Sequence, residues 1–350
     1  MEQRTMKALV KEASGKDGLV LKTVPVPACG PEEVLIRVVY AGVCGTDLHI
    51  ARDEYTVFMP VIIGHEFSGV VEQVGDRVTN CAPGDRVVSL TCSVHCGTCD
   101  FCRQGLYMLC PNKRGLGSGY DGAFAEYMKT PADLVLKIPD GLTMQEAALS
   151  EPLASVVRAV TENMTVTAGV RVYVSGAGMM GQLTAQLCTA SSADVTIAGI
   201  RGDEARLELA GKLCAAHTVD ASGADLEERV REITEGDFYD VVFECCGAPK
   251  SMETCIALCR RRGQYCQIGL YGNDIPVPMD KALMKELRLT TSFSATHSSW
   301  KRMFRLIRQG KFTLSPYVGS MFPLERWEEA FRLAESGKEY KVLFQISEET

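Results

Sequence analysis

The sequence lacks any long hydrophobic run. None of its uninterrupted apolar segments approaches the roughly 20 residues that a helix needs to cross a bilayer. The first residues, M-E-Q-R-T-M-K, contain no apolar stretch before a cleavage site of small residues, so we expect no secretion signal. Both absences argue against a membrane partner.

An excess of basic residues is absent as well. Aspartate and glutamate number 44 against 37 lysines and arginines, which gives a net charge of −7. Nucleic-acid binding needs a basic surface, so this balance argues against a nucleic-acid partner. Internal repeats and low-complexity segments are also missing, and the mean hydropathy is +0.01. These properties are typical of a globular protein, and 350 residues are enough for two domains.

Cysteine, in contrast, is abundant. The chain has 15 cysteines, but disulfide frameworks are typical of short secreted chains. Five of them have metal roles in our interpretation, and most of the others stand in apolar contexts such as F-E-C-C-G, where free thiols pack as small hydrophobic side chains. So many free thiols imply a reducing compartment, and we expect a cytoplasmic protein.

Four cysteines form the most informative motif. Cys96, Cys99, Cys102 and Cys110 follow the spacing C-x2-C-x2-C-x7-C, which can bring four thiolates to the corners of one tetrahedron. The residues between them are turn-forming and polar, a poor setting for an apolar core. The motif therefore predicts a closed structural zinc site, which stabilises its loop and does no chemistry.

A second candidate metal site lies upstream. Cys44 stands in A-G-V-C-G-T-D-L-H, and the pair His65–Glu66 stands in I-G-H-E-F. One thiolate, one imidazole and one carboxylate suit a catalytic zinc ion with an open coordination position.

A candidate nucleotide loop lies further along the chain. In S-G-A-G-M-M-G the glycines Gly176, Gly178 and Gly181 follow an apolar run and precede a helical pattern. In that context backbone N–H groups at the helix N-terminus face a pyrophosphate, so the pattern predicts dinucleotide binding. Two metal sites followed by a nucleotide loop indicate an enzyme.

The pattern of apolar residues predicts two different folds. Residues 1 to about 150 alternate short β-branched runs with Gly, Pro and Asp, which is typical of an antiparallel, barrel-like domain. Thr143 and Glu146 form a capping box, so a helix should begin there and lead into the second domain. From Val170 onward strands alternate with helices, which predicts an α/β, doubly wound parallel sheet. The tail should contain an amphipathic helix, W-K-R-M-F-R-L-I-R, and a last strand, Y-K-V-L-F-Q-I.

The order of these motifs resembles the zinc-dependent medium-chain dehydrogenases, and among them the polyol dehydrogenases, which include sorbitol (L-iditol) and threonine dehydrogenases. The motifs G-V-C-G-T-D-L-H, G-H-E-F-S-G-V-V-E, the cysteine lobe, S-E-P-L-A and G-A-G-M-M-G cover nearly the whole chain. The resemblance implies a GroES-like catalytic domain of residues 1–152 and 295–350, with a zinc lobe at about 92–112, and a Rossmann domain of residues 153–294. It also implies two zinc ions per chain, NAD(P), a small alcohol or ketone substrate, and a homo-oligomer, dimer or tetramer.

The resemblance assigns ligands to the catalytic zinc. Cys44 and His65 match two family ligands. Glu66, and Glu151 in S-E-P-L-A, both match carboxylates placed at the metal, and which of them is the third ligand stays open. For Glu151 the alternative is a capping or salt-bridging carboxylate.

The resemblance also implies a proton path. Thr46 and His49 match a hydroxyl and an imidazole that pass the proton of the alcohol through the cofactor ribose to solvent. Histidine suits such a step because its ordinary pKa lies near physiological pH. The alternative for Thr46 is ordinary hydrogen bonding in a turn.

We expect the choice between NAD and NADP to depend on the residues that follow the next strand after the glycine loop. NAD enzymes place an acidic residue there, whereas this chain has Gly199, with Arg201 two residues further. That pattern resembles the Gly-x-Arg turn of NADP-preferring relatives, in which the arginine pairs with the 2′-phosphate. We therefore lean to NADP, although the turn is longer here, Asp203 could bind the ribose, and Arg201 could be a solvated charge. The cofactor residues expected in addition are Met179 (where most relatives have proline), Met180, Arg206, Gly269, Leu270, Phe293 and Ser294.

The substrate is the least determined property. Animal-type sorbitol dehydrogenases carry Arg–Tyr where this chain has Ser294–Ala295, so the arginine that grips the polyol is absent. Threonine dehydrogenases carry a further histidine where this chain has Ser93, with His95 two residues on, which weakens the threonine interpretation. We expect oxidation of a secondary alcohol on a polyol, sugar alcohol or cyclitol. The alternatives are a threonine-3-dehydrogenase-like or sugar-phosphate activity and, in another class, a non-catalytic zinc- and nucleotide-binding sensor.

Overall fold

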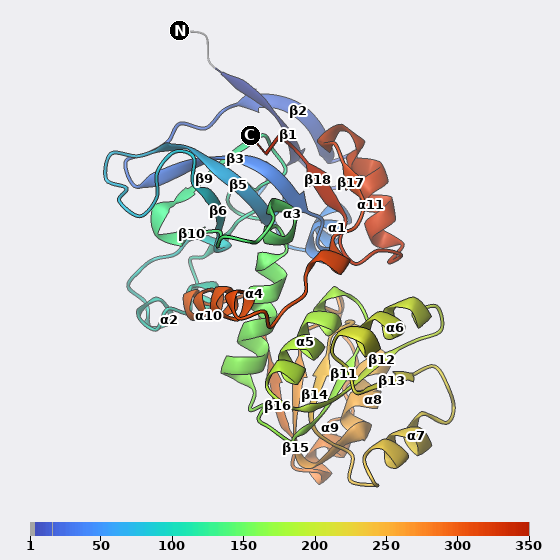
Figure 1. The fold of residues 1–350 in the computed structure, drawn as a ribbon. Helices are drawn as coiled ribbons and strands as arrows, with labels where there is room; N and C mark the ends of the chain where they lie inside the picture. Colours follow the sequence, from blue (N-terminus) through green and yellow to red (C-terminus); the bar gives the residue numbers. More distant parts are fainter. Residues whose placement is uncertain (1–3, 16, 350) are drawn as a thin grey trace. The chain divides into compact units, whose positions relative to one another are not determined.

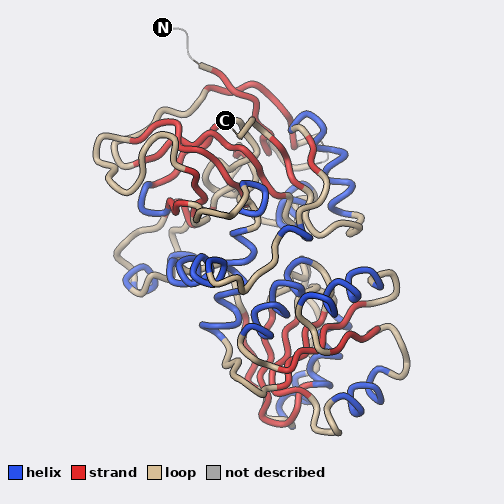
Figure 2. Tube along the Cα trace, in the orientation of Figure 1, coloured by secondary structure: helices blue, strands red, loops and turns tan. Residues whose placement is uncertain are grey.

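The computed structural model describes residues 4–15 and 17–349. The chain divides into two compact units, residues 1–152 with 314–350 and residues 153–313 (Figures 1 and 2). Residues 295–313, which the resemblance groups with the catalytic domain, belong by their contacts to the second unit. One reason is that Thr296 and Arg302 are bonded to Glu162 and Thr161 of that unit. The domain limits implied by the resemblance therefore stay a prediction.

Two β-sheets form most of the first unit. In the smaller sheet, β1 pairs antiparallel with both β2 and β4. The larger sheet has the order β10-β6-β5-β3-β18-β17, with β9 also paired to β3. The strands of the two sheets are β1 (Thr5–Lys11), β2 (Leu19–Pro25), β3 (Glu33–Gly42), β4 (Val61–Ile62), β5 (Glu66–Val74), β6 (Arg86–Ser89), β9 (Tyr127–Pro131), β10 (Val135–Lys137), β17 (Met321–Phe322) and β18 (Leu343–Gln345).

Strand β3 forms the centre of the larger sheet. Its sequence E-V-L-I-R-V-V-Y-A-G is rich in β-branched residues, and nearly all of them are buried, as suits a strand covered on both faces. Val34, Ile36 and Val38 belong to the core of this unit together with Phe124 and Phe344. The last strand, β18, pairs antiparallel with β3, so the C-terminal segment closes the sheet begun near the N-terminus. The predicted antiparallel, barrel-like domain is confirmed.

Short helices and a hairpin complete the first unit. Strands β7 and β8 pair in a small antiparallel hairpin that carries the cysteine lobe. The capping box of Thr143 and Glu146 is present and begins α3, as predicted. The remaining elements are α1 (Gly45–Ala51), β7 (Cys92–Val94), α2 (Asp100–Arg103), η1 (Tyr107–Leu109), β8 (Arg114–Gly115), η2 (Ala132–Leu134), α3 (Met144–Ala147), η4 (Ser315–Tyr317), η5 (Leu324–Arg326) and α11 (Trp327–Glu335).

The second unit contains the predicted doubly wound sheet. Its strands lie in the order β13-β12-β11-β14-β15-β16, and every neighbouring pair is parallel. This is the Rossmann order 3-2-1-4-5-6. The strands are β11 (Arg171–Ser175), β12 (Asp194–Gly199), β13 (His217–Asp220), β14 (Tyr239–Glu244), β15 (Cys259–Gln267) and β16 (Arg288–Thr291).

Helices cover both faces of this sheet (Figure 1). Leu226, Ile256 and Ala282, from three different helices, share one apolar cluster with Tyr173 and Val242 of the sheet. The helices of that face are α7 (Leu226–Ile233), α8 (Pro249–Leu258) and α9 (Met279–Met284), and the opposite face carries α5 (Met179–Ala190) and α6 (Glu204–Leu213).

Two further helices flank the sheet. Helix α4 (Ser150–Arg158) continues into the π-helical turn η3 (Ala159–Asn163). Helix α10 (His297–Arg308) is the amphipathic helix expected in the tail, and its capping box begins at Thr296. Among the described residues no helix is both long and apolar enough to cross a membrane.

Candidate functional site

Four cysteine sulfurs converge in the cysteine lobe. The sulfur atoms of Cys96, Cys99, Cys102 and Cys110 all lie within 4.8 Å of one another, and those of Cys96 and Cys102 are 3.9 Å apart. Zinc–sulfur bonds of about 2.3 Å place the corners of a tetrahedron about 3.8 Å apart. The arrangement therefore fits a structural zinc ion.

Backbone N–H groups donate hydrogen bonds to two of these sulfurs. The N–H of Cys99 points to the Cys96 sulfur at 3.3 Å, and the N–H of Cys102 points to the Cys99 sulfur at 3.5 Å. Backbone N–H groups of Thr98 and Cys99 lower the pKa of Cys96 to about 5, whereas burial raises the pKa of Cys102 to about 12. Four thiolates in one small volume repel one another, so only a bound cation makes all four stable together.

The second candidate metal site forms in the same unit. Ligand atoms of Cys44, His65 and Glu66 lie within 4.8 Å of one another. Cys44 is the N-cap of α1, and Glu66 begins β5. Gly64 has a φ of +92°, and a Cβ there would overlap the ring of Phe124, so the turn that presents His65 requires glycine. A thiolate, an imidazole and a carboxylate at this spacing fit a zinc ion with room for a further ligand.

A buried aspartate organises two of these ligands. Asp47 is fully buried, its Oδ2 accepts the N–H of Cys44 at 2.9 Å, and its Oδ1 lies 3.6 Å from Nδ1 of His65. Burial lowers the pKa of His65, but the charges of Asp47 and Cys44 outweigh it, and the net pKa lies well above the ordinary value. A metal ligand histidine commonly has such a carboxylate behind it, because the carboxylate fixes the orientation of the ring. Sequence reasoning missed Asp47, although C-G-T-D already places it at the third position of a helix.

Lys341 is a second residue beside this candidate metal site that the sequence did not reveal. Its Nζ lies 2.9 Å from Oε1 and 2.6 Å from Oε2 of Glu66, and both side chains are buried. Only the Oε1 contact has hydrogen-bond geometry, so the Oε2 contact is an ion pair alone. Gly42 makes room for the pair, since a Cβ there would lie 2.5 Å from Oε2. A metal ion at this site would therefore compete with Lys341 for the same carboxylate.

The predicted relay residues lie on α1. The Cys44 sulfur lies 3.8 Å from Oγ1 of Thr46, which places that hydroxyl beside a candidate metal ligand. Nδ1 of His49 lies 2.7 Å from Oε2 of Glu54, which orients the imidazole. Glu151, in contrast, lies on α4 and is not one of the residues whose ligand atoms converge on Cys44.

The glycine loop lies between β11 and α5, where the sequence predicted it. Gly176 has a φ of +106°, which favours glycine. A Cβ on Gly181 would collide with the carbonyl of Gly176, while the space beside Gly178 is open. Gly178 is the N-cap, Met179 and Met180 form the first turn, and their N–H groups have no partner within the helix. This cradle fits a pyrophosphate.

The turn after β12 holds the residues expected to distinguish the cofactors. Oδ2 of Asp203 accepts the N–H of Ile200 at 3.0 Å, and its Oδ1 lies 3.4 Å from Nη1 of Arg206. A Cβ on Gly199 would lie 2.8 Å from Cβ of Asp203, so glycine allows this close turn. Asp203 is thus engaged in its own turn, and Arg201 is exposed beside it.

A buried carboxylate organises the loops after β14 and β15. Glu244 is fully buried and accepts the N–H of Gly247 at 3.0 Å and the side-chain amide of Gln267 at 2.6 Å. A Cβ on Gly269 would lie 2.6 Å from Oε2 of Glu244. Glu244 therefore fixes the loop that carries Gly269 and the 55% exposed Leu270. Nothing in F-E-C-C-G distinguished this glutamate from the apolar strand before it.

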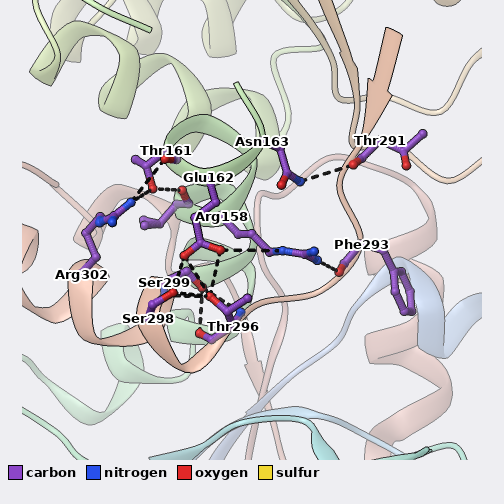
Figure 3. Close-up of polar contacts among 11 residues, drawn as sticks. Arg158, Thr161, Glu162, Asn163, Thr291, Phe293, Thr296, Ser298, Ser299 and Arg302 are labelled. Carbon is purple, nitrogen blue, oxygen red and sulfur yellow. Dashed lines mark hydrogen bonds and ion pairs between the residues drawn. The ribbon is translucent and has the colours of Figure 1, made fainter. Parts of the chain in front are cut away.

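The last predicted cofactor residues follow β16. Phe293 is 47% exposed, and Ser294 has a φ of +62°. Figure 3 shows that the segment around them is bonded to the helical turn at Arg158 and Glu162. No local motif in the sequence indicated these contacts.

Comparison with known proteins follows the same division of the chain. Residues 30–140 match the family model of the alcohol dehydrogenase GroES-like domain, and residues 180–309 match that of the zinc-binding dehydrogenase. A sorbitol dehydrogenase of Halalkalibacterium halodurans is 35% identical over 339 residues, which cover 97% of this chain and 98% of that protein. A D-arabitol-phosphate dehydrogenase of Enterococcus avium is 34% identical over 348 residues, 99% of each protein. A crystal structure of a zinc-binding dehydrogenase of Sinorhizobium meliloti bound to NADP has a TM-score of 0.89 and 29% identity, and the match covers 98% of this chain and 100% of that one.

Proposed function

The chain belongs to the zinc-dependent medium-chain dehydrogenases, and on that premise we propose that it oxidises a secondary alcohol of a polyol, sugar alcohol or cyclitol with NADP. The family makes it a zinc- and NAD(P)-dependent oxidoreductase. The convergence of Cys44, His65 and Glu66 within 4.8 Å carries the proposal, because it is the arrangement a catalytic zinc needs.

The residues around the catalytic zinc site would have different roles. A bound zinc ion makes an alcohol more acidic and, in the reverse direction, polarises a carbonyl. Cys44, His65 and Glu66 would hold it, with Glu66 favoured over Glu151 because its carboxylate is already beside the other two ligands. Asp47 fixes the ring of His65. The four cysteines of the lobe would hold a second, structural zinc, which gives two per chain.

The proton of the alcohol needs a path to solvent. Thr46 is suited to accept it first, because its hydroxyl lies beside Cys44. His49 is suited to pass it on, because Glu54 orients its ring and can stabilise a positive charge on it.

The preference for NADP rests on the turn after β12. The Asp203 carboxylate is bonded to the N–H of Ile200 and lies beside Arg206, so it is poorly placed to accept a ribose hydroxyl. Arg201 is exposed at this turn, so its guanidinium is the group best suited to pair with a 2′-phosphate. We further propose a homo-oligomer, to be measured by sedimentation.

A sugar phosphate is the second candidate substrate. Arg114 stacks on Phe58, with Cζ 3.4 Å from the ring centroid, and its buried Nη1 has no hydrogen-bond partner among the described residues. The loop that follows packs against Gly64, next to His65, since a Cβ on Gly117 would lie 2.7 Å from the Gly64 carbonyl oxygen. A phosphate would give this guanidinium an acceptor. The likeness to a D-arabitol-phosphate dehydrogenase points the same way.

One experiment separates these functions. Reduction of NADP and of NAD is followed with a panel of polyols, cyclitols, polyol phosphates and threonine. The proposal expects the highest kcat/KM for an unphosphorylated polyol or cyclitol with NADP. If a polyol phosphate is the best substrate, the second candidate function is favoured. If threonine is the best substrate, both candidates are contradicted. If no secondary alcohol is turned over, the non-catalytic sensor becomes the favoured alternative.

A further inference from the structure

The helix that opens the second unit ends in an unusual turn. After α4, residues 159–163 form the π-helical turn η3. Such turns are rare and often lie at functional sites. Figure 3 shows side chains of Arg158, Glu162 and Asn163 pointing toward the segment that links β16 to α10.

The carboxylate of Glu162 binds the far end of that segment. It accepts the hydroxyl of Thr296 at 2.9 and 3.0 Å from its two oxygens, and the hydroxyl of Ser298 at 2.6 Å (Figure 3). Thr296 is the N-cap of α10. The start of this helix is therefore fixed to η3.

The guanidinium of Arg158 binds the middle of the segment. Its Nη1 donates to the carbonyl oxygen of Phe293, and its Nε lies 3.9 Å from Oε2 of Glu162. Arg158 is 8% exposed, so water does not compete freely for these contacts. Burial lowers the pKa of Arg158, and the charge of Glu162 opposes that effect, so the carboxylate offsets part of the cost of burying the guanidinium.

Two further contacts bracket this pair. The side-chain amide of Asn163 donates to the carbonyl of Thr291 at 3.3 Å, at the end of β16. Arg302, on α10, donates to the hydroxyl of Thr161 in η3. Of these contacts, only that of Arg158 holds the Phe293 carbonyl.

The backbone at this point needs such support. Ser294 has a φ of +62°, a conformation that residues other than glycine adopt at a cost in free energy. A backbone in that state persists when surrounding contacts determine it. The bond from Arg158 to Phe293 immediately precedes the strained residue.

We propose that Arg158, held by Glu162, is a positioning residue that fixes the Phe293–Ser294 backbone for cofactor binding. The proposal rests on the proposed function and on the prediction from the sequence that Phe293 and Ser294 belong to its cofactor site. In this proposal Arg158 acts through the Phe293–Ser294 backbone and not by contact with the cofactor or the reacting atoms. Its effect is to hold the bound conformation of the turn before the cofactor arrives, which lowers the ordering cost of binding.

Variants of full-length, zinc-loaded protein test this. Arg158→Met removes the bond to Phe293, Arg158→Lys keeps a single charged donor, and Arg302→Met is the matched control that breaks another contact between α10 and η3. Two properties are measured: hydrogen exchange of backbone amides 292–296 without cofactor, and the Kd for NADPH and NADH from their fluorescence.

We expect Arg158→Met to speed exchange at residues 292–296 and to raise the Kd of the cofactor that the wild type prefers by about tenfold or more, the loss usual for a charged hydrogen bond. Arg158→Lys should recover part of both effects, and Arg302→Met should leave the Kd within about twofold of wild type. If Arg158→Met does not fold, Arg158→Lys and Glu162→Gln carry the test, each with a smaller change in the same direction.

The outcomes separate the two proposals. Faster exchange in Arg158→Met with an unchanged Kd for both nucleotides would overturn the positioning role while leaving the proposed function intact. An equal rise in Kd for Arg302→Met would also overturn it, because general loosening of α10 would then be the cause. A wild type that binds neither nucleotide would overturn the proposed function, and the positioning role with it.

Discussion

Lys341 lies 2.6 Å from the carboxylate of Glu66, and both side chains are buried. The buried carboxylate therefore has a cation beside it before any metal binds. Zinc at Cys44 and His65 would give Glu66 a second cation, so the strengths of the two contacts are linked.

This linkage predicts the behaviour of Lys341→Met. Removing one partner of a buried ion pair commonly costs about 3–5 kcal/mol, because the other charge is left uncompensated. Zinc can compensate Glu66 in place of the lysine, so the loss should be largest in metal-free protein. The Tm is measured with zinc and after chelation. The exposed pair of Lys7 and Glu325 supplies the control, since Lys7→Met should change neither value. Equal destabilisation of both forms by Lys341→Met would show that Glu66 and zinc do not interact.

The two metal sites should differ in what their loss does. Metal analysis is expected to find about two zinc ions per chain. Cys102→Ala removes a ligand of the closed site and should give unfolded or insoluble protein, because zinc supplies much of the folding free energy of such a lobe. Cys44→Ala should give a folded protein with one zinc and no activity. Normal turnover in Cys44→Ala would contradict the catalytic assignment.

Replacement of His49 should affect turnover in a pH-dependent way. His49→Ala leaves water to carry the proton from Thr46 to solvent, and water accepts protons poorly at low pH. Loss of a general acid–base group typically costs about 10²–10⁴-fold, and we expect the deficit in kcat to be greatest at low pH. Glu54→Gln, which keeps a side chain of the same size beside the ring, should give a smaller effect. Zinc loss in His49→Ala would instead indicate a structural role.

Arg201 should determine cofactor choice. A charged hydrogen bond contributes about 1.5–3 kcal/mol, so Arg201→Ala should raise the KM for NADP by roughly 10- to 150-fold and change the KM for NAD little. Lys212→Ala, which removes a positive charge from the last turn of the following helix α6, is the control. A wild type that prefers NAD would mean that another group governs the site and that Arg201 is a surface charge.

Local motifs predict the cysteine lobe and the nucleotide loop because the residues of each lie close in the sequence. The four lobe cysteines span 15 residues, and the glycines of the phosphate loop span six, so spacing alone implies geometry. The strand and helix pattern gave the parallel sheet for the same reason, since its periodicity is local. The separation between Glu66 and Lys341, 275 positions, shows the limit. Such a pair exists only after the whole first unit has folded.

Polar residues that act by positioning others are equally hard to predict. Glu244 reads as the last residue of an apolar strand, and Arg158 and Glu162 read as the charged side of an amphipathic helix. Arg158 binds a backbone carbonyl and Glu244 a backbone N–H, groups that every residue carries, and Glu162 binds hydroxyls 134 and 136 positions away, so no partner can be recognised in the sequence. Asp47 differs from these residues, because it belongs to the motif C-G-T-D.

The pairing of β18 with β3 also sets an order of events during synthesis. A ribosome must make the entire dinucleotide-binding unit, residues 153–313, before the strand that completes the first unit emerges. Until then the nascent chain holds Cys44, His65 and Glu66 without Lys341, so the acidic ligand has no internal counter-charge. Zinc bound at that stage would not compete with Lys341 for the carboxylate of Glu66. The last residues of the chain therefore supply the cation with which a bound zinc ion would have to share the Glu66 carboxylate.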